Sequence, residues 1–160
     1  MNSARVIRAF ALLGATVALA GCETAAISSS SGGLPAANEI TIVNNQGGRV
    51  LGYAWRIKKV NELGTGVRFA GRCASACTLY LAAERSCILP GATFGFHAPY
   101  GSSAKGNRSV RSFMLRNYPA WVRNWLYARG GLTESFKVMP YSYARRFIRP
   151  CSKPARMAAV

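Results

Sequence analysis

The chain has 160 residues, enough for one domain, and 50% of them are hydrophobic, which excludes a polar chain too poor in apolar residues to build a core. The chain has 21 Lys and Arg residues and 5 acidic residues, so its formal net charge is +16. All five acids are Glu, which excludes any site that needs an Asp. This charge favours binding to anionic surfaces. We nevertheless interpret the Arg residues as lying on solvated faces of helices, and we expect no nucleic-acid partner.

The first 21 residues are typical of a signal segment rather than of a folded domain. Arg5 and Arg8 form a basic start, and the apolar run at 9–20 is too short to span a bilayer comfortably. The run ends in Leu-Ala-Gly-Cys, which resembles the bacterial lipobox, where the cysteine is lipidated. The resemblance implies that Cys22 begins an exported lipoprotein. Its lipid would anchor it in a membrane of the cell envelope, inner or outer, facing the periplasm. Ordinary signal cleavage is the alternative.

Residues 22–38 are rich in Ser, Gly and Ala and predict a flexible tether. A single domain at 39–151 and a basic tail at 152–160 follow. The domain contains four cysteines, Cys73, Cys77, Cys87 and Cys151, and in an oxidising compartment this even number predicts two disulfides of open pairing. The Cys73–Cys77 spacing also suits a metal, but no histidine or second cysteine pair lies nearby, so we predict no metal and no other cofactor.

The domain begins with a β-branched run at 39–43, which predicts a strand, and a glycine-rich turn at 44–48. Helical apolar spacing covers 49–63. A strand at 66–70, a helix at 75–83 and strands at 86–89 and 93–97 follow. This alternation predicts an α/β fold built from right-handed βαβ crossovers. After a polar loop at 100–107, helices are predicted at 108–117 and 120–129, and a less regular helical segment at 133–149, broken at Pro140.

Ser75 lies where a strand gives way to a helix, and His97, the only histidine, ends a later strand. The carboxyl ends of parallel strands meet at one edge of a sheet, where ligand sites of open α/β sheets lie. The first N–H groups of a helix lack internal partners and can stabilise an oxyanion. We therefore interpret Ser75 as a nucleophile and His97 as its base. Taken singly, a helix N-cap explains Ser75 and a packed strand end explains His97.

The family resemblance is carried by three segments, NNQGGRV, GRCASACTLYLAAE and ILPGATFGFHAPYG. In this order they resemble the Clp protease proteolytic subunit within the crotonase-like superfamily, over residues 40–101, and more closely its exported proteobacterial relatives. The resemblance implies a truncated crotonase/Clp-protease-like βαβ fold with C-terminal helices and a peptide substrate. It assigns Ser75 as nucleophile, His97 as base, and the N–H groups of Gly48 and Ala76 as the oxyanion hole. Because the family forms rings or trimers, it also implies a homo-oligomer.

The chain departs from this family in its acid. The third triad member is normally an Asp, whereas Glu134 is the only acid after His97 and is the candidate here. A Ser–His dyad oriented by a backbone carbonyl is the alternative. The sequence thus predicts an exported lipoprotein with a peptidase-like serine-hydrolase site. Two other functions stay open: a catalytically degenerate envelope module that binds a partner through its basic helices, and binding of a polyanion or anionic lipid by the 105–129 face.

Overall fold

The computed structural model describes residues 38–152. The predicted signal segment, Cys22, the tether before residue 38 and the tail beyond residue 152 lie outside the described residues. Within them the elements follow in this order: β1 (Glu39–Asn45), α1 (Val50–Glu62), β2 (Gly66–Ala74), the 3-10 helix η1 (Ser75–Ala82), β3 (Ser86–Ile88), β4 (Thr93–Phe96), α2 (Ala104–Asn117), α3 (Ala120–Tyr127), β5 (Lys137–Pro140) and α4 (Tyr141–Ala144).

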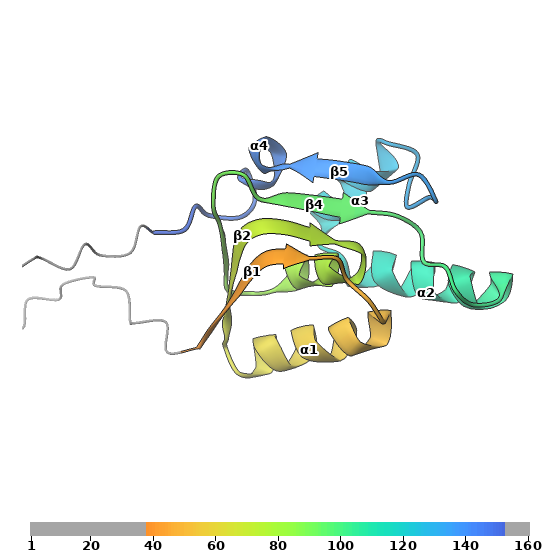
Figure 1. Cartoon of the computed structure of the whole chain (residues 1–160), viewed down its shortest axis with the longest axis horizontal. Helices are drawn as coiled ribbons and strands as arrows, with labels where there is room; N and C mark the ends of the chain where they lie inside the picture. The colour runs from red at the N-terminus through yellow and green to blue at the C-terminus, as the bar shows by residue number, and fades with distance from the viewer. Residues whose placement is uncertain (1–37, 153–160) are drawn as a thin grey trace, which may run out of the picture. The chain divides into compact units, whose positions relative to one another are not determined.

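The strands form one mixed sheet with the order β1-β2-β4-β5, and β3 pairs with β2. All pairings among β1 to β4 are parallel, whereas β5 runs antiparallel to β4. Figure 1 shows the arrowheads of β1, β2 and β4 pointing the same way, with α2 on the side of the arrowheads. The carboxyl ends of the parallel strands therefore face one end of the sheet, which α2 borders.

The long strand β2 has two partners along the same edge. Its residues 67–69 pair with β3, and its residues 72–74 pair with β4. Between these partners the chain leaves the sheet through a turn at 89–92. This step brings the end of β4 level with the end of β2, so the residues that follow the two strands start side by side.

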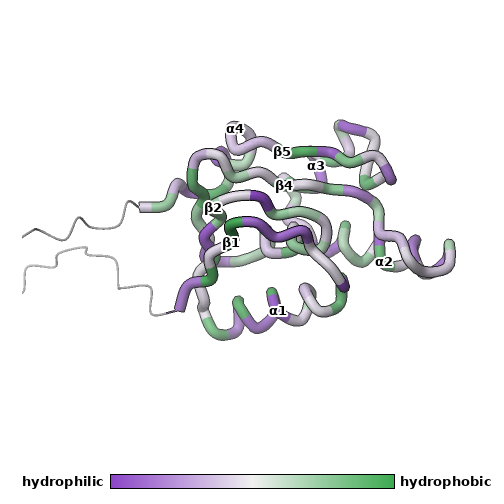
Figure 2. The backbone as a smooth tube through the Cα atoms, in the orientation of Figure 1, coloured by the Kyte–Doolittle hydropathy of each residue, from purple (hydrophilic) through white to green (hydrophobic). Residues whose placement is uncertain are grey.

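One face of the sheet carries most of the core. Its buried side chains alternate along the strands, as expected when a sheet packs helices against one face. The helix α1 contributes Tyr53, Ile57 and Val60 to the same cluster. Figure 2 shows hydrophobic and hydrophilic positions alternating along α1, in keeping with a helix that buries a single face. The inward sheet residues are Ile42, Val67, Phe69, Cys73, Ile88, Phe94, Phe96 and Met139.

The mixed α/β class and the strands predicted near 39–43, 66–70, 86–89 and 93–97 are confirmed. The boundaries differ in places. The second strand continues to Ala74, and α2 begins at Ala104 because the Ser103 side chain accepts a hydrogen bond from Gly106 N at 3.1 Å and caps the helix. The predicted helix after Ser75 has 3-10 geometry.

The helical segment predicted over 133–149, broken at Pro140, was wrong in its part before the break, whereas a short helix does follow Pro140. The chain there forms the edge strand β5, with Met139 buried opposite Phe94, and then the short helix α4. Pro140 explains the change, because proline lacks the N–H that a helix interior needs but fits an edge strand and the start of a helix. The sheet is therefore mixed and ends in an antiparallel strand.

Candidate functional site

Ser75 has an unusual backbone conformation at the junction of β2 and η1. Its φ is +56°, and it is the one non-glycine residue with positive φ along residues 38–152. Such left-handed geometry costs about 1–2 kcal/mol for a residue with a Cβ. Residues held in this way cluster at functional sites, where the surrounding structure imposes the conformation.

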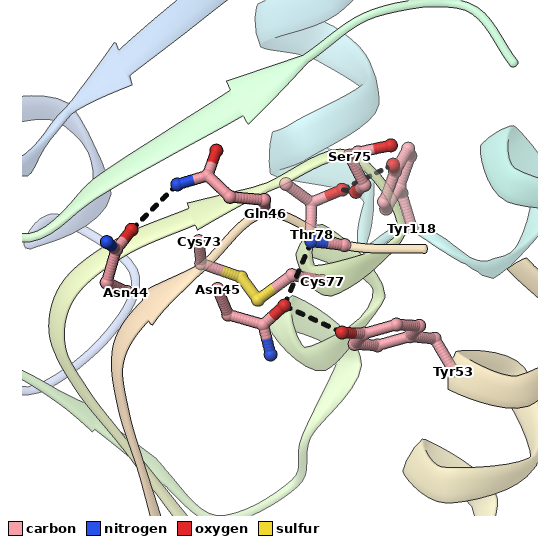
Figure 3. Close-up of a disulfide and its surroundings, with 10 residues drawn as sticks. Asn44, Asn45, Gln46, Tyr53, Cys73, Ser75, Cys77, Thr78 and Tyr118 are labelled. Atoms are coloured by element: carbon pink, nitrogen blue, oxygen red, sulfur yellow. Dashed lines mark hydrogen bonds between the residues drawn. A yellow bond between two sulfur atoms is a disulfide. The ribbon is translucent and has the colours of Figure 1, made fainter. Parts of the chain in front are cut away.

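Two features next to Ser75 impose this conformation. The Cys73–Cys77 disulfide bridges the end of β2 to the first turn of η1, with Cα atoms 5.4 Å apart. The Thr78 hydroxyl donates to the Ser75 carbonyl oxygen at 2.6 Å and lies 2.7 Å from the Tyr118 hydroxyl. Figure 3 shows the Ser75 side chain pointing away from the disulfide, which leaves its hydroxyl group clear of the bridge.

Burial raises the pKa of the Tyr118 hydroxyl above its ordinary value, with the Thr78 hydrogen bond opposing the shift. Tyr118 therefore stays neutral. Because Thr78 uses its proton toward the Ser75 carbonyl, the Tyr118 hydroxyl is the donor to Thr78. A two-step chain of hydrogen bonds from the interior thus holds the backbone of Ser75.

The glycine-rich turn after β1 presses against the Ser75 turn. Gly47 has a φ of +86°, and a Cβ there would lie 2.6 Å from the Ala74 carbonyl oxygen and 2.7 Å from the Ala76 nitrogen. The Asn45 side chain fixes the turn, since its Oδ1 accepts from Gly47 N at 2.9 Å and from the Tyr53 hydroxyl at 2.6 Å. Only glycine allows so close an approach.

A cleft of about 800 Å³ opens where the parallel strands end. It is bordered by the turn after β1, the start of α1, the Ser75 turn, the loop after β4 and one face of α2. Its lining residues include Gly48, Ser75, His97, Tyr100, Val110 and Met114. Ser75 and His97 thus share one cleft, although no hydrogen bond joins their side chains in this structure.

His97 is held by the backbone next to it. Its Nδ1 lies 2.8 Å from the Ala98 carbonyl oxygen, which can only accept, so Nδ1 carries the proton and Nε2 of the neutral ring is free to accept one. The ring lies 5.6 Å from the Tyr100 ring and stacks 6.0 Å from the Phe136 ring. This is the tautomer that a general base acting through Nε2 requires.

Glu134, the candidate third member, lies exposed in the loop before β5, and none of the hydrogen bonds or ion pairs of residues 38–152 joins it to His97. The neighbouring Thr133 does contact the His97 loop, because its carbonyl oxygen accepts from Ala98 N at 2.6 Å. The group that contacts the His97 imidazole is thus the Ala98 carbonyl oxygen and not an acid. This contact corresponds to the alternative of a Ser–His dyad oriented by a backbone carbonyl.

The two residues assigned to the oxyanion hole border the Ser75 turn in different ways. Gly48 lines the cleft, whereas Ala76 is fully buried in the first turn of η1, where N–H groups have no partner inside a helix. Gly47 brings their two chain segments into contact. Both N–H groups thus belong to backbone segments that meet beside Ser75.

The predicted pair of disulfides is confirmed, and the pairing is Cys73–Cys77 and Cys87–Cys151. Along residues 38–152, no three His, Cys, Asp or Glu side chains gather in a way that could hold a metal ion. The cysteines serve as covalent links within the fold.

The sequence did not predict Thr78 and Tyr118, the buried polar residues whose hydrogen bonds hold the Ser75 backbone. Thr78 follows Ser75 by three residues at the start of a helix, a spacing that could have indicated a side chain returning to the Ser75 carbonyl. Tyr118 comes 40 residues after Thr78, and no local pattern links the two.

The chain matches no known protein-family model and has no significant match among curated proteins. None of the helices among residues 38–152 is both long enough and apolar enough to cross a membrane.

Proposed function

We propose that this protein is a serine hydrolase of the Clp-protease-like type, with Ser75 as nucleophile and His97 as general base. The observation that carries the proposal is the pairing of two features in one cleft. Ser75 has a left-handed backbone held by a disulfide and a buried hydrogen bond, and His97 has its Nδ1 tied to a carbonyl so that Nε2 is free. Neither a helix N-cap nor a packed histidine needs this combination.

In the proposed reaction, His97 Nε2 takes the proton of the Ser75 hydroxyl while Oγ attacks the carbonyl carbon of an ester or peptide bond. The carbonyl oxygen becomes an oxyanion that the N–H groups of Gly48 and Ala76 stabilise. His97 then gives its proton to the leaving group, and the acyl group stays on Ser75 Oγ. A water molecule, deprotonated by His97, releases the acid and restores the serine.

The Ala98 carbonyl orients the imidazole but brings no full negative charge to the imidazolium that forms. Replacing the acid of a well-known serine protease by its amide lowers turnover by about 10⁴ through the wrong tautomer, whereas here the carbonyl keeps the right tautomer. The proposed dyad is therefore slower than a full triad but faster than one with a misoriented histidine.

The lipobox resemblance supports a location at the cell envelope, with lipidated Cys22 in the inner or outer membrane and the domain facing the periplasm. The two disulfides suit such an oxidising compartment. The family resemblance supports a peptide substrate and assembly into a homo-oligomer. Labelling with radioactive palmitate, compared between the native chain and Cys22→Ala, tests the anchor.

A fluorophosphonate probe tests the site directly. The folded, oxidised protein should gain one probe mass, mapped to Ser75 by peptide sequencing, and Ser75→Ala should abolish it while exposed Ser109→Ala does not. His97→Ala should slow labelling by about 10²–10⁴, the usual contribution of a general base. Labelling that is absent, or that proceeds unchanged in His97→Ala, rules out the dyad.

One observation favours a second function, a non-catalytic envelope module. The helix α2 carries Lys105, Arg108, Arg111 and Arg116, none of which forms an ion pair with another described residue. Such a face suits an acidic partner, a polyanion or anionic lipid. Binding of the lipid-free domain to anionic vesicles should then fall steeply with salt, while the fluorophosphonate leaves Ser75 unlabelled.

A further inference from the structure

The charge of the cleft wall is uneven. Arg49 is the one Lys, Arg, Asp or Glu that lines it, and its side chain forms no ion pair with another described residue. Arg49 is exposed and comes directly after Gly48, so it lies next to a proposed oxyanion donor. A guanidinium stays protonated at every physiological pH. The cleft wall therefore carries one permanent positive charge, on the residue that follows Gly48.

No carboxylate among residues 38–152 lines the cleft. The acids of residues 38–152 are Glu39, Glu62, Glu84 and Glu134. Glu39 pairs with Arg68, and Glu62 pairs with Lys58 and Lys59, so two of them are neutralised elsewhere. None of the four lines the cleft. Among the described residues, no acid in the cleft wall offsets the charge of Arg49.

Part of the cleft wall is apolar. Val110 and Met114 come from one face of α2, four residues apart, and line the cleft together with Val50 and Leu51 at the start of α1. Met114 is buried, and Val110 is partly buried and packs on the core. A substrate in this cleft therefore meets hydrocarbon from both α1 and α2, the polar Asn107 of α2, and one cation at the start of α1.

From this arrangement we infer that the hydrolase acts on acyl substrates whose acyl part bears a carboxylate, held by Arg49, on a short hydrocarbon spacer that packs on Val110 and Met114. The inference rests on the proposed function and specifies its substrate class. A bidentate guanidinium–carboxylate contact is the strongest pairing that a single side chain offers an acid. A cationic acyl group is disfavoured, because none of the described residues that line the cleft is a carboxylate that could receive it.

The experiment uses the oxidised protein and three 4-nitrophenyl esters of matched acyl length: glutarate monoester (anionic), pentanoate (neutral) and 4-trimethylammonio-butyrate (cationic). Turnover transfers the acyl group to Ser75 Oγ and releases 4-nitrophenolate, and water then frees the acid. The kcat/KM should be about tenfold higher for the anionic than for the neutral ester, as one well-placed charge contact gives, and lowest for the cationic ester.

Arg49→Gln should reduce the anionic-to-neutral ratio toward one, and Arg49→Lys should keep part of it. Arg116→Gln is the matched control, since it removes one charge from an exposed position of α2 outside the cleft and should leave the ratio as in the native protein. The control separates a contact at Arg49 from general attraction to a protein of +16 charge.

The outcomes separate the two proposals. Turnover of all three esters at similar rates, or an equal drop of the ratio in Arg49→Gln and Arg116→Gln, overturns the substrate inference and leaves the hydrolase standing. No turnover of any ester, combined with no fluorophosphonate labelling of Ser75, overturns the hydrolase and the substrate inference with it.

Discussion

The Thr78 hydroxyl donates a hydrogen bond to the carbonyl oxygen of Ser75 at 2.6 Å, and both residues belong to the first turn and a half of η1. Thr78 is fully buried and also meets the Tyr118 hydroxyl. The strained residue that carries the proposed nucleophile is thus anchored from the core rather than from the cleft.

Replacing Thr78 by Val keeps its shape and removes its hydroxyl. The Ser75 carbonyl and the Tyr118 hydroxyl then lose a buried partner, which should cost about 1–3 kcal/mol in the free energy of unfolding. Fluorophosphonate labelling of Ser75 should slow as well, because the backbone relaxes. Urea unfolding and labelling rates measure the two effects. Thr78→Ser is the control, since it keeps the hydroxyl, and it should label close to the native rate. Native labelling in Thr78→Val would show that the hydroxyl does not hold the site.

Gly47→Ala should damage both the fold and the site. The new Cβ would collide with backbone atoms of Ala74 and Ala76, and the residue would keep an unfavourable φ of +86°. We expect a loss of at least about 2 kcal/mol in the free energy of unfolding and slower labelling of Ser75. Gly52→Ala is the matched control, because Gly52 lies in α1 with open space around it. That change should stabilise the protein by about 0.5–1 kcal/mol. Equal stabilities for the two variants would contradict the close packing of the two turns.

The two disulfides should differ in what they support. Cys87–Cys151 closes 64 residues, so its loss should cost about 4 kcal/mol of stability, whereas Cys73–Cys77 closes 4 residues and should cost about 2 kcal/mol. The effect on labelling of Ser75 should be reversed, with the Cys73→Ala/Cys77→Ala pair slower than the Cys87→Ala/Cys151→Ala pair. Thermal unfolding and labelling at a temperature where both variants are folded give the comparison. If the long-loop pair loses more labelling, the short disulfide does not support the Ser75 turn.

Tyr118 should make the protein sensitive to alkali. Burial raises its pKa, so the folded state keeps a proton that the unfolded chain gives up above about pH 10. Its stabilising contribution is therefore complete below about pH 10 and declines above it. Tyr118→Phe should be less stable at pH 8 by about 1 kcal/mol, for the lost hydrogen bond, yet should show a shallower decline toward pH 11. Urea unfolding across this range measures the slope. The exposed Tyr127→Phe should follow the native curve, and parallel curves for all three proteins would contradict the assignment.

The sequence predicted those parts of the fold that are determined by residues close together in the chain. The β-branched run at 39–43, the apolar spacing at 49–63 and the glycine-rich turn between them each determine structure within a few residues. The order of strands and helices then implied that Ser75 and His97 would lie at strand ends near each other. The number of disulfides followed from the four cysteines of the predicted domain.

The parts that could not be predicted depend on partners far along the chain. The strand β5 forms because β4 offers an unpaired edge, which Met139 and Val138 do not reveal by themselves. The pairing of four cysteines depends on which Cα atoms the fold brings together. The contact between Thr78 and Tyr118 and the carbonyl that orients His97 also require the folded backbone.

The Cys87–Cys151 disulfide joins β3 to the last described residues, and beside it Ile88 exchanges backbone hydrogen bonds with Arg149 and Cys151. Between the two cysteines lie β4, α2, α3, β5 and α4, and with them the loop that borders His97. A protease that nicks this loop at exposed Gly101 therefore releases neither fragment, since the pieces remain covalently tied. The two fragments separate on a gel only after reduction. The loop at the cleft can therefore be cleaved while the Cys87–Cys151 disulfide still joins the two parts of the domain.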